Sequence, residues 1–264
     1  MYLTNFIYDN ISLNSFGYIV CEFNTSSQDT ISNGSNIEFT TVPMNNGRHF
    51  ALANSKYSEV ITATFSICKD PCVANYSPAL TVTEISEITS WLTRLGFHKL
   101  QVDADGYENL FFMGSFHNVS RVELGGEVIG LTFEFTSDAP FAYKNQRIDT
   151  LTFTQAGTQE LYVYTDDLGE FYPTVKITCG AAGDITINDC TIKNCRAGEI
   201  INIDYPTISE EPSRNAPHDL ANDFNYNFIP LYKGVVGAYE INEITASAPC
   251  TIEFKYNPIV KVGL

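Results

Sequence analysis

Apolar side chains recur at every second position in two segments of the first half of the chain, 61–67 and 129–136. A period of two places the apolar side chains on one face of a strand and the intervening polar side chains on the other. We therefore predict two strands, each with one buried and one wet face. The apolar positions are Ile61, Ala63, Phe65, Ile67, Ile129, Leu131, Phe133 and Phe135.

Two short glycine-containing breaks separate further apolar runs. Gly125-Gly126 stands between the run 119–124 and the strand that restarts at Glu127. Ala104-Asp105-Gly106 stands between two runs that cover 100–102 and 110–112. Glycine supplies the positive φ that tight turns need, so each break predicts a β-hairpin.

Residues 85–95 show helical rather than strand spacing, with glutamates and an arginine on the opposite side. Thr81 and Thr83 are both candidate N-caps, and Thr81-x-x-Glu84 has the form of a capping box. Gly96 is the expected residue after the helix end. One helix among strands and hairpins predicts an α+β domain in which the helix covers one sheet face. The apolar stripe is Ile85, Ile88, Trp91, Leu92 and Leu95.

The pattern changes after Pro140, which biases Ala139 away from helical backbone and interrupts the strand. Short β runs then recur between glycine, asparagine and aspartate residues, which is typical of a β-sandwich. We predict two domains, 1–145 and 146–264, with polar, exposed loops at 24–36 and 206–217. The predicted strands of the second domain are 151–154, 161–164, 174–179, 184–188, 199–204 and 251–256.

The composition agrees with a packed, mainly β protein. Of 264 residues, 44% are hydrophobic, 13% are aromatic and only 17% are charged, which argues against disorder. The net charge of −16 leaves few cations to neutralise phosphates, so we predict no sequence-specific nucleic-acid partner and no anionic membrane partner. Two interpretations of the charge stay open: solubility through self-repulsion, or an acidic lumen past which DNA slides.

The cysteines and the N-terminus predict a protein that is made and kept in a cytosol, at least until assembly. Seven cysteines, an odd number, do not suit a secreted disulfide scaffold, and we expect reduced, mostly buried thiols. Cys68-x3-Cys72 and Cys190-x4-Cys195 lack the tight pairing and flanking histidines of zinc sites. The first residues lack the basic and apolar regions of a signal peptide, and no segment has the length of a membrane helix.

Motifs for catalysis are absent: the chain has no nucleophile elbow, phosphate-binding loop or zinc-protease motif. Four histidines do not cluster, although His98 and His117 lie on predicted strands and would have to meet in space to form a pair. Two unrelated polar side chains are the favoured interpretation. We predict that the protein is not an enzyme and that it has no catalytic, cofactor-binding or metal-binding residues. The histidines are His49, His98, His117 and His218.

Several acidic residues resemble parts of sites, with simpler explanations favoured. Asp103-x-Asp105-Gly106 resembles the opening of a calcium loop, but it lacks the closing glutamate and fits a hairpin turn better. Asp166-Asp167 and the pair Asp219 and Asp223 are candidates for a cation or acid–base site. Such pairs arise by chance among 31 acidic residues.

Aromatic residues offer two candidate sugar-binding surfaces. Trp91 lies on the apolar stripe of the predicted helix, so a core position is favoured over a sugar platform. Phe171-Tyr172, together with the alternating aromatic residues at 224, 226 and 228, would line a carbohydrate surface on the second domain. The favoured alternative is the buried face of one strand, since aromatic residues at a period of two are ordinary strand packing. The alternating residues are Phe224, Tyr226 and Phe228.

Several segments in order resemble the distal tail proteins of siphophages. The opening segment 11–23 includes Phe16-Gly17-Tyr18-Ile19-Val20, and the helix with Trp91-Leu92 is followed by a strand with Leu100-Gln101-Val102-Asp103. The closing segment Phe133-Glu134-Phe135-Thr136-Ser137-Asp138-Ala139-Pro140-Phe141-Ala142-Tyr143 carries the most specific likeness. The resemblance covers about the first 145 residues well, and the second half matches more loosely through 222–225 and 250–256.

The resemblance implies a mainly β fold with a tail-tube-like N-terminal β-sandwich that carries one helix. A galectin-like or carbohydrate-module-like β-sandwich would follow, and the chain's end would return to the first domain. A homohexameric ring, single or stacked, would join the tail tube protein to a tail-associated hub or lysin protein and a receptor-binding protein. Its location would be the tail tip of the virion, after synthesis in the bacterial host cytoplasm. From their polar, turn-rich composition, we predict that 24–36 and 41–57 are arms that reach a neighbouring subunit.

The alternative function is a carbohydrate-binding adhesion module that contacts the host cell wall. It requires an exposed aromatic pair on the second domain, chosen among Tyr226, Phe228 and Tyr232. A wall hydrolase is less favoured, because it would need two converging carboxylates or a metal that no motif indicates.

Overall fold

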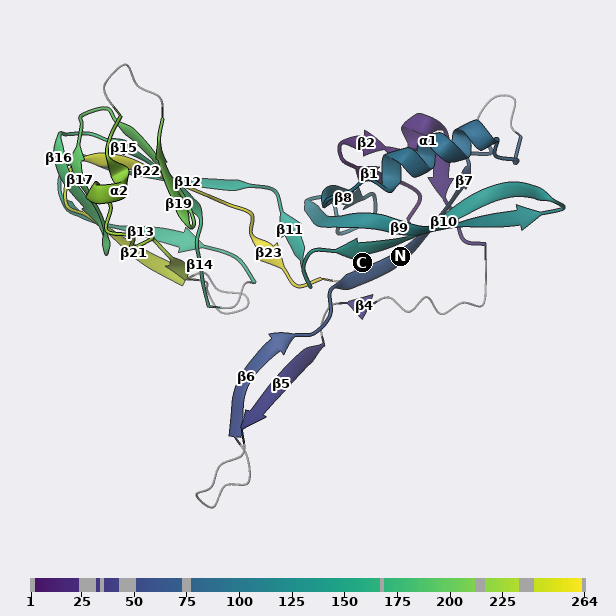
Figure 1. The fold of residues 1–264 in the computed structure, drawn as a ribbon, viewed down its shortest axis with the longest axis horizontal. Coiled ribbons are helices and arrows are strands. Elements are labelled where there is room, and N and C mark those ends of the chain that lie inside the picture. The colour runs from purple at the N-terminus through teal and green to yellow at the C-terminus, as the bar shows by residue number, and fades with distance from the viewer. Residues whose placement is uncertain are drawn as a thin grey trace. The chain divides into compact units, whose positions relative to one another are not determined.

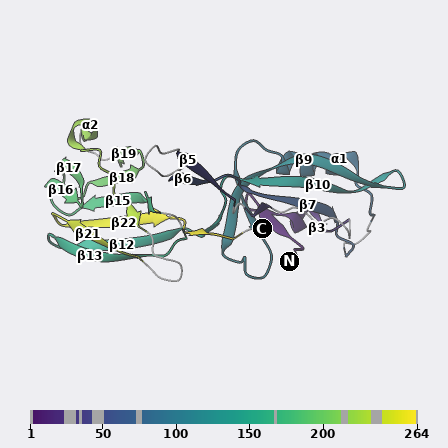
Figure 2. The ribbon, with the colours of Figure 1, turned by 90° about the horizontal axis from the view of Figure 1, so that it is seen from below.

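The computed structural model describes residues 3–23, 32–33, 36–42, 51–72, 77–166, 169–211, 217–232 and 240–262. The chain divides into two compact units, each with its own core. Unit 1 comprises residues 1–144 with 261–264, and unit 2 comprises residues 145–260. Each is built mainly from antiparallel strands (Figures 1 and 2). No described helix has the length and apolarity of a membrane span.

Unit 1 is organised around one antiparallel sheet with the order β2-β1-β8-β9-β10-β7-β3. Strand β11 also pairs with β9, and β4 pairs with β7. A 3-10 helix, η1 (Leu13–Phe16), connects β2 to β3. The strands are β1 (Phe6–Tyr8), β2 (Ile11–Ser12), β3 (Tyr18–Val20), β4 (Ser32–Asn33), β7 (Ile61–Lys69), β8 (His98–Val102), β9 (Leu110–Leu124), β10 (Glu127–Ser137) and β11 (Ala142–Lys144).

The two predicted hairpins of unit 1 are confirmed. Strands β8 and β9 pair around the turn that contains Gly106, whose φ is 88°. Strands β9 and β10 pair around Gly125-Gly126, and Leu124 lies opposite Glu127. The predicted apolar runs 110–112 and 119–124 belong to one continuous 15-residue strand, β9.

One sheet face of unit 1 buries a cluster of aromatic rings. Phe116 on β9 lies at its centre, with ring centroids between 5.0 and 6.2 Å from five other rings. These rings come from three other strands, β1, β7 and β10, so the cluster ties the sheet together across its width. Aromatic pairs at such distances contribute about 0.5–1.5 kcal/mol beyond their area burial. The five rings belong to Phe6, Tyr8, Phe65, Phe133 and Phe135.

Helix α1 (Val82–Leu92) covers this sheet face, as predicted (Figure 1). Its buried side chains are Ile88, Trp91 and Leu92, and Trp91 stacks on Phe6 with centroids 6.0 Å apart. The core position of Trp91 is confirmed. The prediction for the helix end is wrong, because the C-cap is Thr93 and Leu95 lies beyond it, 98% exposed.

A separate two-stranded hairpin, β5 (Ile37–Val42) with β6 (Ala51–Tyr57), belongs to unit 1 and pairs with no other described strand. Residues 36–41 and 54–56 are exposed, so the described part of the hairpin is wet on both faces. Its ion pair, Glu38 with Lys56 at 3.2 Å, is also exposed. The segment 41–57, predicted as an arm, includes β6, while 43–50 lies outside the described residues.

Unit 2 is a β-sandwich, as predicted. One sheet has the order β12-β22-β15-β18-β19 and the other β13-β21-β16-β17. Inward side chains alternate along the strands, so that β22 shows a strict buried-intermediate pattern. The strands are β12 (Arg147–Phe153), β13 (Gly157–Val163), β15 (Thr174–Cys179), β16 (Gly183–Ile187), β17 (Cys190–Cys195), β18 (Ile200–Asp204), β19 (Thr207–Glu210), β21 (Glu240–Ala246) and β22 (Cys250–Tyr256).

Short strands correct the two predicted loops, 206–217 in unit 2 and 24–36 in unit 1. The segment 206–217 was predicted as a loop, but its first part is strand β19, which pairs with β18; 212–216 lie outside the described residues. Of the predicted loop 24–36, only 32–33 and 36 are described, and 32–33 form β4. The remaining elements are β14 (Glu170–Phe171) with β20 (Leu231–Tyr232), β23 (Ile259–Val260) and helix α2 (Leu220–Asp223).

The start of α1 provides a test of this packing. Thr81 is the N-cap: its hydroxyl accepts from the Glu84 amide at 3.3 Å, and the Glu84 carboxylate accepts from the Thr81 amide at 2.7 Å. Replacing Thr81 by Ala removes the cap, and we expect a loss of about 1 kcal/mol of unfolding free energy in chemical denaturation.

Thr83→Ala is the matched control, because Thr83 is an exposed residue in the first turn of the same helix. Alanine has the higher helix propensity, so this variant should be as stable as the parent or slightly more stable. An equal loss in both variants would contradict the assignment of the capping box.

Candidate assembly and ligand surfaces

The β5–β6 hairpin exposes two large apolar side chains of unit 1. Ile37 and Phe39, two residues apart on β5, point to the same side of the strand and are 47% and 58% exposed. An isolated two-stranded hairpin is marginally stable in water, since it lacks a second layer. Exposed ion pairs such as Glu38–Lys56 contribute little. The hairpin therefore has the form of an element that is completed by another surface.

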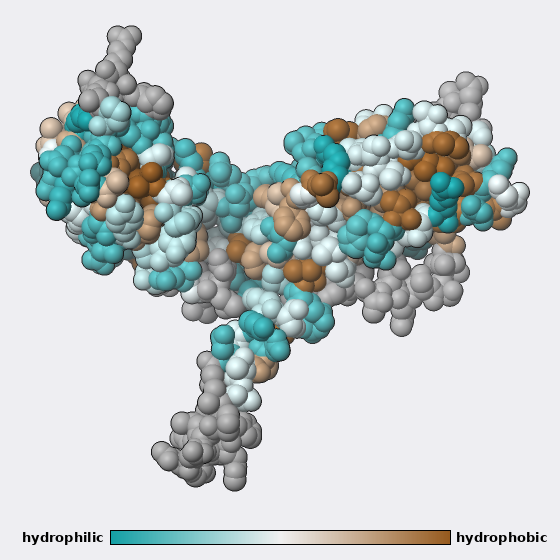
Figure 3. Space-filling view, in the orientation of Figure 1, coloured by the Kyte–Doolittle hydropathy of each residue, from teal (hydrophilic) through white to brown (hydrophobic). Residues whose placement is uncertain are grey.

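A second apolar region of unit 1 surrounds α1. Phe16 is 39% exposed and lies 4.8 Å from Trp91 between ring centroids. Leu95 and Phe97, on the connection from α1 to β8, are 98% and 59% exposed. Figure 3 shows apolar residues, in brown, gathered over the part of unit 1 that carries α1 and the β9–β10 hairpin. The indole Nε1 of Trp91 is buried without a hydrogen-bond partner among the described residues.

Unit 2 carries a hollow of about 460 Å³ lined mainly by aromatic side chains. Tyr172 and Tyr205 stack with ring centroids 4.3 Å apart and an interplanar angle of 13°. Phe228 meets Tyr205 edge to face at 4.9 Å. Tyr226 also lines the hollow and is 58% exposed. Asp189, Asn227 and Pro230 complete the lining.

Asn225 fixes the loop that forms one wall of the hollow. Its side-chain oxygen accepts from the amides of Thr191 (3.0 Å) and Asn227 (3.1 Å), and its Nδ2 donates to the Asp189 carbonyl at 2.7 Å. Tyr226, between Asn225 and Asn227 in the chain, has a backbone φ of 60°. This conformation is uncommon for a large side chain and costs of order 1–3 kcal/mol. The hydrogen bonds hold this strained residue, so its ring stays outward.

The favoured sequence interpretation of this region, one buried strand face, is wrong. Phe224 is 4% exposed, but residues 225–230 form no strand, and the positive φ of Tyr226 breaks the alternation. Among the residues named for an exposed aromatic pair, Tyr226 and Tyr232 are 58% and 51% exposed, and Phe228 is intermediate.

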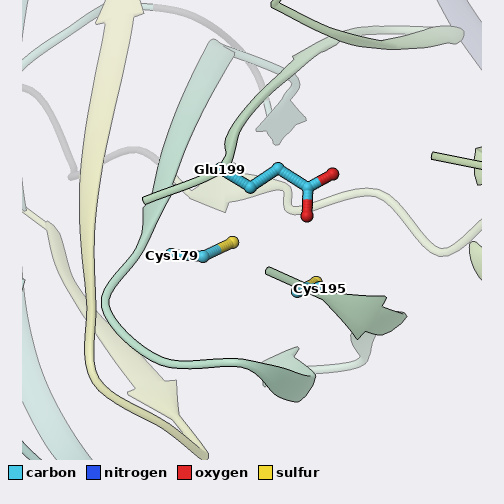
Figure 4. Close-up of side chains that lie close together, drawn as sticks. All are labelled: Cys179, Cys195 and Glu199. Atoms are coloured by element: carbon cyan, nitrogen blue, oxygen red, sulfur yellow. The ribbon is translucent and has the colours of Figure 1, made fainter. Parts of the chain in front are cut away.

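A buried polar cluster lies at the edge of the unit 2 core. Cys179, Cys195 and Glu199 place their sulfur and oxygen atoms within 4.8 Å of one another (Figure 4). Cys179 ends β15 and Cys195 ends β17, while Glu199 follows a turn. Thiolate, imidazole and carboxylate groups are zinc ligands, so the cluster is a candidate metal site by composition.

Hydrogen bonds account for the carboxylate of this cluster without a metal. Glu199 accepts from His218 Nδ1 at 2.6 Å and from the Arg196 amide at 2.7 Å. The other ring nitrogen of His218 lies 3.1 Å from Asp223. An imidazole between two carboxylates donates from both nitrogens when it is protonated. We assign the cluster a structural role: it ties the segment 217–223, with α2, to the core.

Sequence reasoning missed this cluster, since its members are spread over 45 positions of chain in three elements and a turn. His218 and Glu199 have side chains only 2% exposed, and Asp223 is 19% exposed. All seven cysteines are free; four are buried, two are intermediate and Cys72 is exposed.

The other candidate residues do not converge. His98 contacts the Leu95 carbonyl at 3.1 Å and His117 contacts Thr136 at 2.7 Å, and no contact joins the two rings within the described residues. Asp219 accepts from Asn222, whereas Asp223 faces His218. Asp167 and His49 lie outside the described residues. At 104–106, the Tyr107 amide donates to the Ala104 carbonyl in a turn.

Two family models match the chain. A phage tail protein N-terminal domain matches residues 1–139, and a phage tail C-terminal domain matches residues 141–256. The chain belongs to this family of phage tail proteins. No curated protein matches the chain.

A solved structure shares the fold of this phage tail protein. The crystal structure of the Dit protein of phage SPP1, described as a paradigm of the hub adsorption apparatus in phages that infect Gram-positive hosts, is 13% identical. The match has a TM-score of 0.62 and covers 97% of this chain and 99% of that one. A chain of the phage P2 baseplate in its activated conformation with calcium is 10% identical, with a TM-score of 0.45, and covers 97% and 98%. The expected mainly β fold is confirmed by the likeness to the SPP1 Dit protein.

The cluster around His218 predicts a pH-dependent stability. Burial lowers the pKa of the imidazole, but the hydrogen bond and charge of Glu199, with Asp223, outweigh it and raise the pKa above 6.5. The stabilisation is complete below about pH 6.5 and is lost as the pH rises through the raised value. Thermal unfolding of the parent should therefore show a decrease in melting temperature on the alkaline side of neutrality.

His218→Gln should lose this dependence and about 3–5 kcal/mol of stability, because two carboxylates lose their buried cation. The control is His117→Gln, since His117 is partly exposed and lies in unit 1. A pH profile that is unchanged in His218→Gln would refute the assignment.

Proposed function

We propose that this phage tail protein is a distal tail protein, which forms a ring of six copies between the tail tube and the tail-tip apparatus of a long, non-contractile tail. Membership of the phage tail family supports a structural rather than a catalytic role. The fold shared with the SPP1 Dit protein over nearly the whole chain supports the position at the distal hub. The virion tail tip is the proposed location.

The exposed β5–β6 hairpin is the observation that carries this proposal. A closed ring needs a heterologous interface, in which one surface of each copy meets a different surface of the next. The hairpin offers apolar side chains and two unpaired strand edges, and strand edges readily pair with further chains. Docking on a neighbouring copy would give Ile37 and Phe39 the second layer that they lack.

The proposed partners are the tail tube protein on one side of the ring and a hub or lysin protein with a receptor-binding protein on the other. The net charge of −16 suits a ring with a lumen that DNA crosses without adhering, since like charges repel. The same charge argues against sequence-specific nucleic-acid binding.

The mass of the purified protein in solution tests the proposal. Light scattering across a range of concentrations should show a discrete species of six copies, or two such rings stacked. The double variant Ile37→Ser, Phe39→Ser should dissociate at concentrations about tenfold higher than the parent or more, because truncating apolar anchors at an interface weakens it by at least about 1 kcal/mol each.

The matched control is Ile148→Ser, Ile241→Ser, which removes two apolar side chains of unit 2 with exposures of 54% and 46%. It should assemble like the parent. Antibodies against the chain should label the tail tip of intact virions. Labelling along the tube or at the head would contradict the proposal, as would a hairpin variant that assembles normally.

A further inference from the structure

The aromatic hollow of unit 2 has features that packing alone does not require. Four of its rings come from three separate segments, and three of them are tyrosines between 40% and 58% exposed. Apolar rings at a folded surface usually gain by burial, so rings held outward around a hollow indicate a ligand. The hollow is open to solvent and has a volume of about 460 Å³.

We propose that this hollow is a binding site for a neutral pyranose sugar unit. The apolar C–H face of a pyranose packs against the flat face of an aromatic ring, and the stacked Tyr172 and Tyr205 present such a platform. Hydroxyl groups of the sugar both donate and accept, which suits an acidic acceptor beside an amide. Asp189 and Asn227 provide this pair in the lining.

The chemistry of the lining separates a sugar from charged ligands. No lysine or arginine lines the hollow among the described residues, and the carboxylate of Asp189 would repel a phosphate or a sulfate. A quaternary ammonium group is recognised by ring faces that surround it. Here Tyr172 and Tyr205 cover one another at an interplanar angle of 13° instead of standing around a central space. A flat, uncharged ligand fits this arrangement best.

The walls of the hollow are held in place by contacts outside the platform. Asn225 ties the loop to the β16–β17 turn through the Asp189 carbonyl, and the Asn227 side chain donates to the same carbonyl at 3.2 Å. The Tyr226 hydroxyl donates to the Ala221 carbonyl at 3.1 Å. A site that is already ordered loses less conformational entropy when a ligand binds. Strained backbone of the kind seen at Tyr226 is concentrated at such ligand clamps.

Saturation-transfer NMR and calorimetry on the full chain test the site. The probes are glucose, galactose, N-acetylglucosamine, lactose and maltose, with glucose 6-phosphate and choline as charged comparisons. We expect saturable binding of at least one neutral sugar, strongest transfer to the ring protons of one sugar face, and weaker binding of the two charged probes. Tyr205→Ala and Tyr226→Ala should each weaken binding about tenfold, as loss of an aromatic anchor does.

Tyr162→Ala is the matched control, because Tyr162 is a 39% exposed tyrosine of the same unit that lies outside the hollow. It should bind like the parent, and all three variants should keep the parent's unfolding transition. Asp189→Asn gives a second readout that does not disturb the rings. It should reduce the affinity for the neutral sugar, and glucose 6-phosphate should not become the preferred ligand.

Three outcomes would overturn the inference: no saturable signal with any neutral sugar at tens of millimolar, preference for choline or the phosphate, or sugar binding that survives both tyrosine variants. None of them bears on ring formation, which is measured on unit 1 variants. A negative result in the sugar-binding test would therefore leave the proposed hub function unaffected, and the reverse also holds.

Discussion

The packing of Phe116 against five other rings is the contact on which unit 1 depends. Strand β9 brings this ring to the middle of the sheet, where it meets side chains from β1, β7 and β10. Since Phe116 is only 2% exposed, α1 must cover the same face, and Trp91 reaches Phe6 and Tyr8 to do so. Once that layer is closed, the β5–β6 hairpin has no apolar layer of its own to join among the described residues of the unit.

The core of unit 2 is built mainly from aliphatic side chains, whereas that of unit 1 is rich in aromatic rings. Two antiparallel sheets enclose mainly isoleucine, valine, leucine and cysteine, and the aromatic rings that line the hollow lie in connections. The core is closed at one edge by the charged contact between Glu199 and His218. Loops around a closed sandwich are free to carry side chains that the core does not need, and this is where Tyr172, Tyr205 and Tyr226 are found.

Much of the fold follows from local patterns in the sequence. The alternation at 61–67 and 129–136, the glycine turns and the Thr81-x-x-Glu84 box predicted their elements, because each depends on residues close together in the chain. The end of α1 was missed, since Leu95 continues the apolar spacing although the helix stops at Leu92. The strand β19 was missed because prolines surround it, and pairing with β18 is a contact that no local pattern reports.

The candidate surfaces were harder to predict for the same reason. Tyr172, Tyr205 and Tyr226 are separated by up to 54 positions, and only the sandwich brings them together. At Tyr226 the alternation of aromatic residues suggested a strand, whereas the backbone has a positive φ and the Asn227 amide donates to the Asn225 side chain. The cluster of Glu199 and His218 likewise depends on long-range folding. The sequence analysis placed Tyr172 and Tyr226 on one candidate surface, but it predicted neither the position of Tyr205 nor the contact between Glu199 and His218.

Trp91 has a consequence for how the molecule can be observed. It is the single tryptophan of the chain, and it lies in unit 1 between the aromatic cluster and the partly exposed Phe16. Indole emission depends on the polarity around the ring, so the natural protein carries a spectroscopic label confined to one unit. The wavelength of its emission reports events on the α1 face. Unfolding of unit 1 can therefore be followed by tryptophan fluorescence without any added dye.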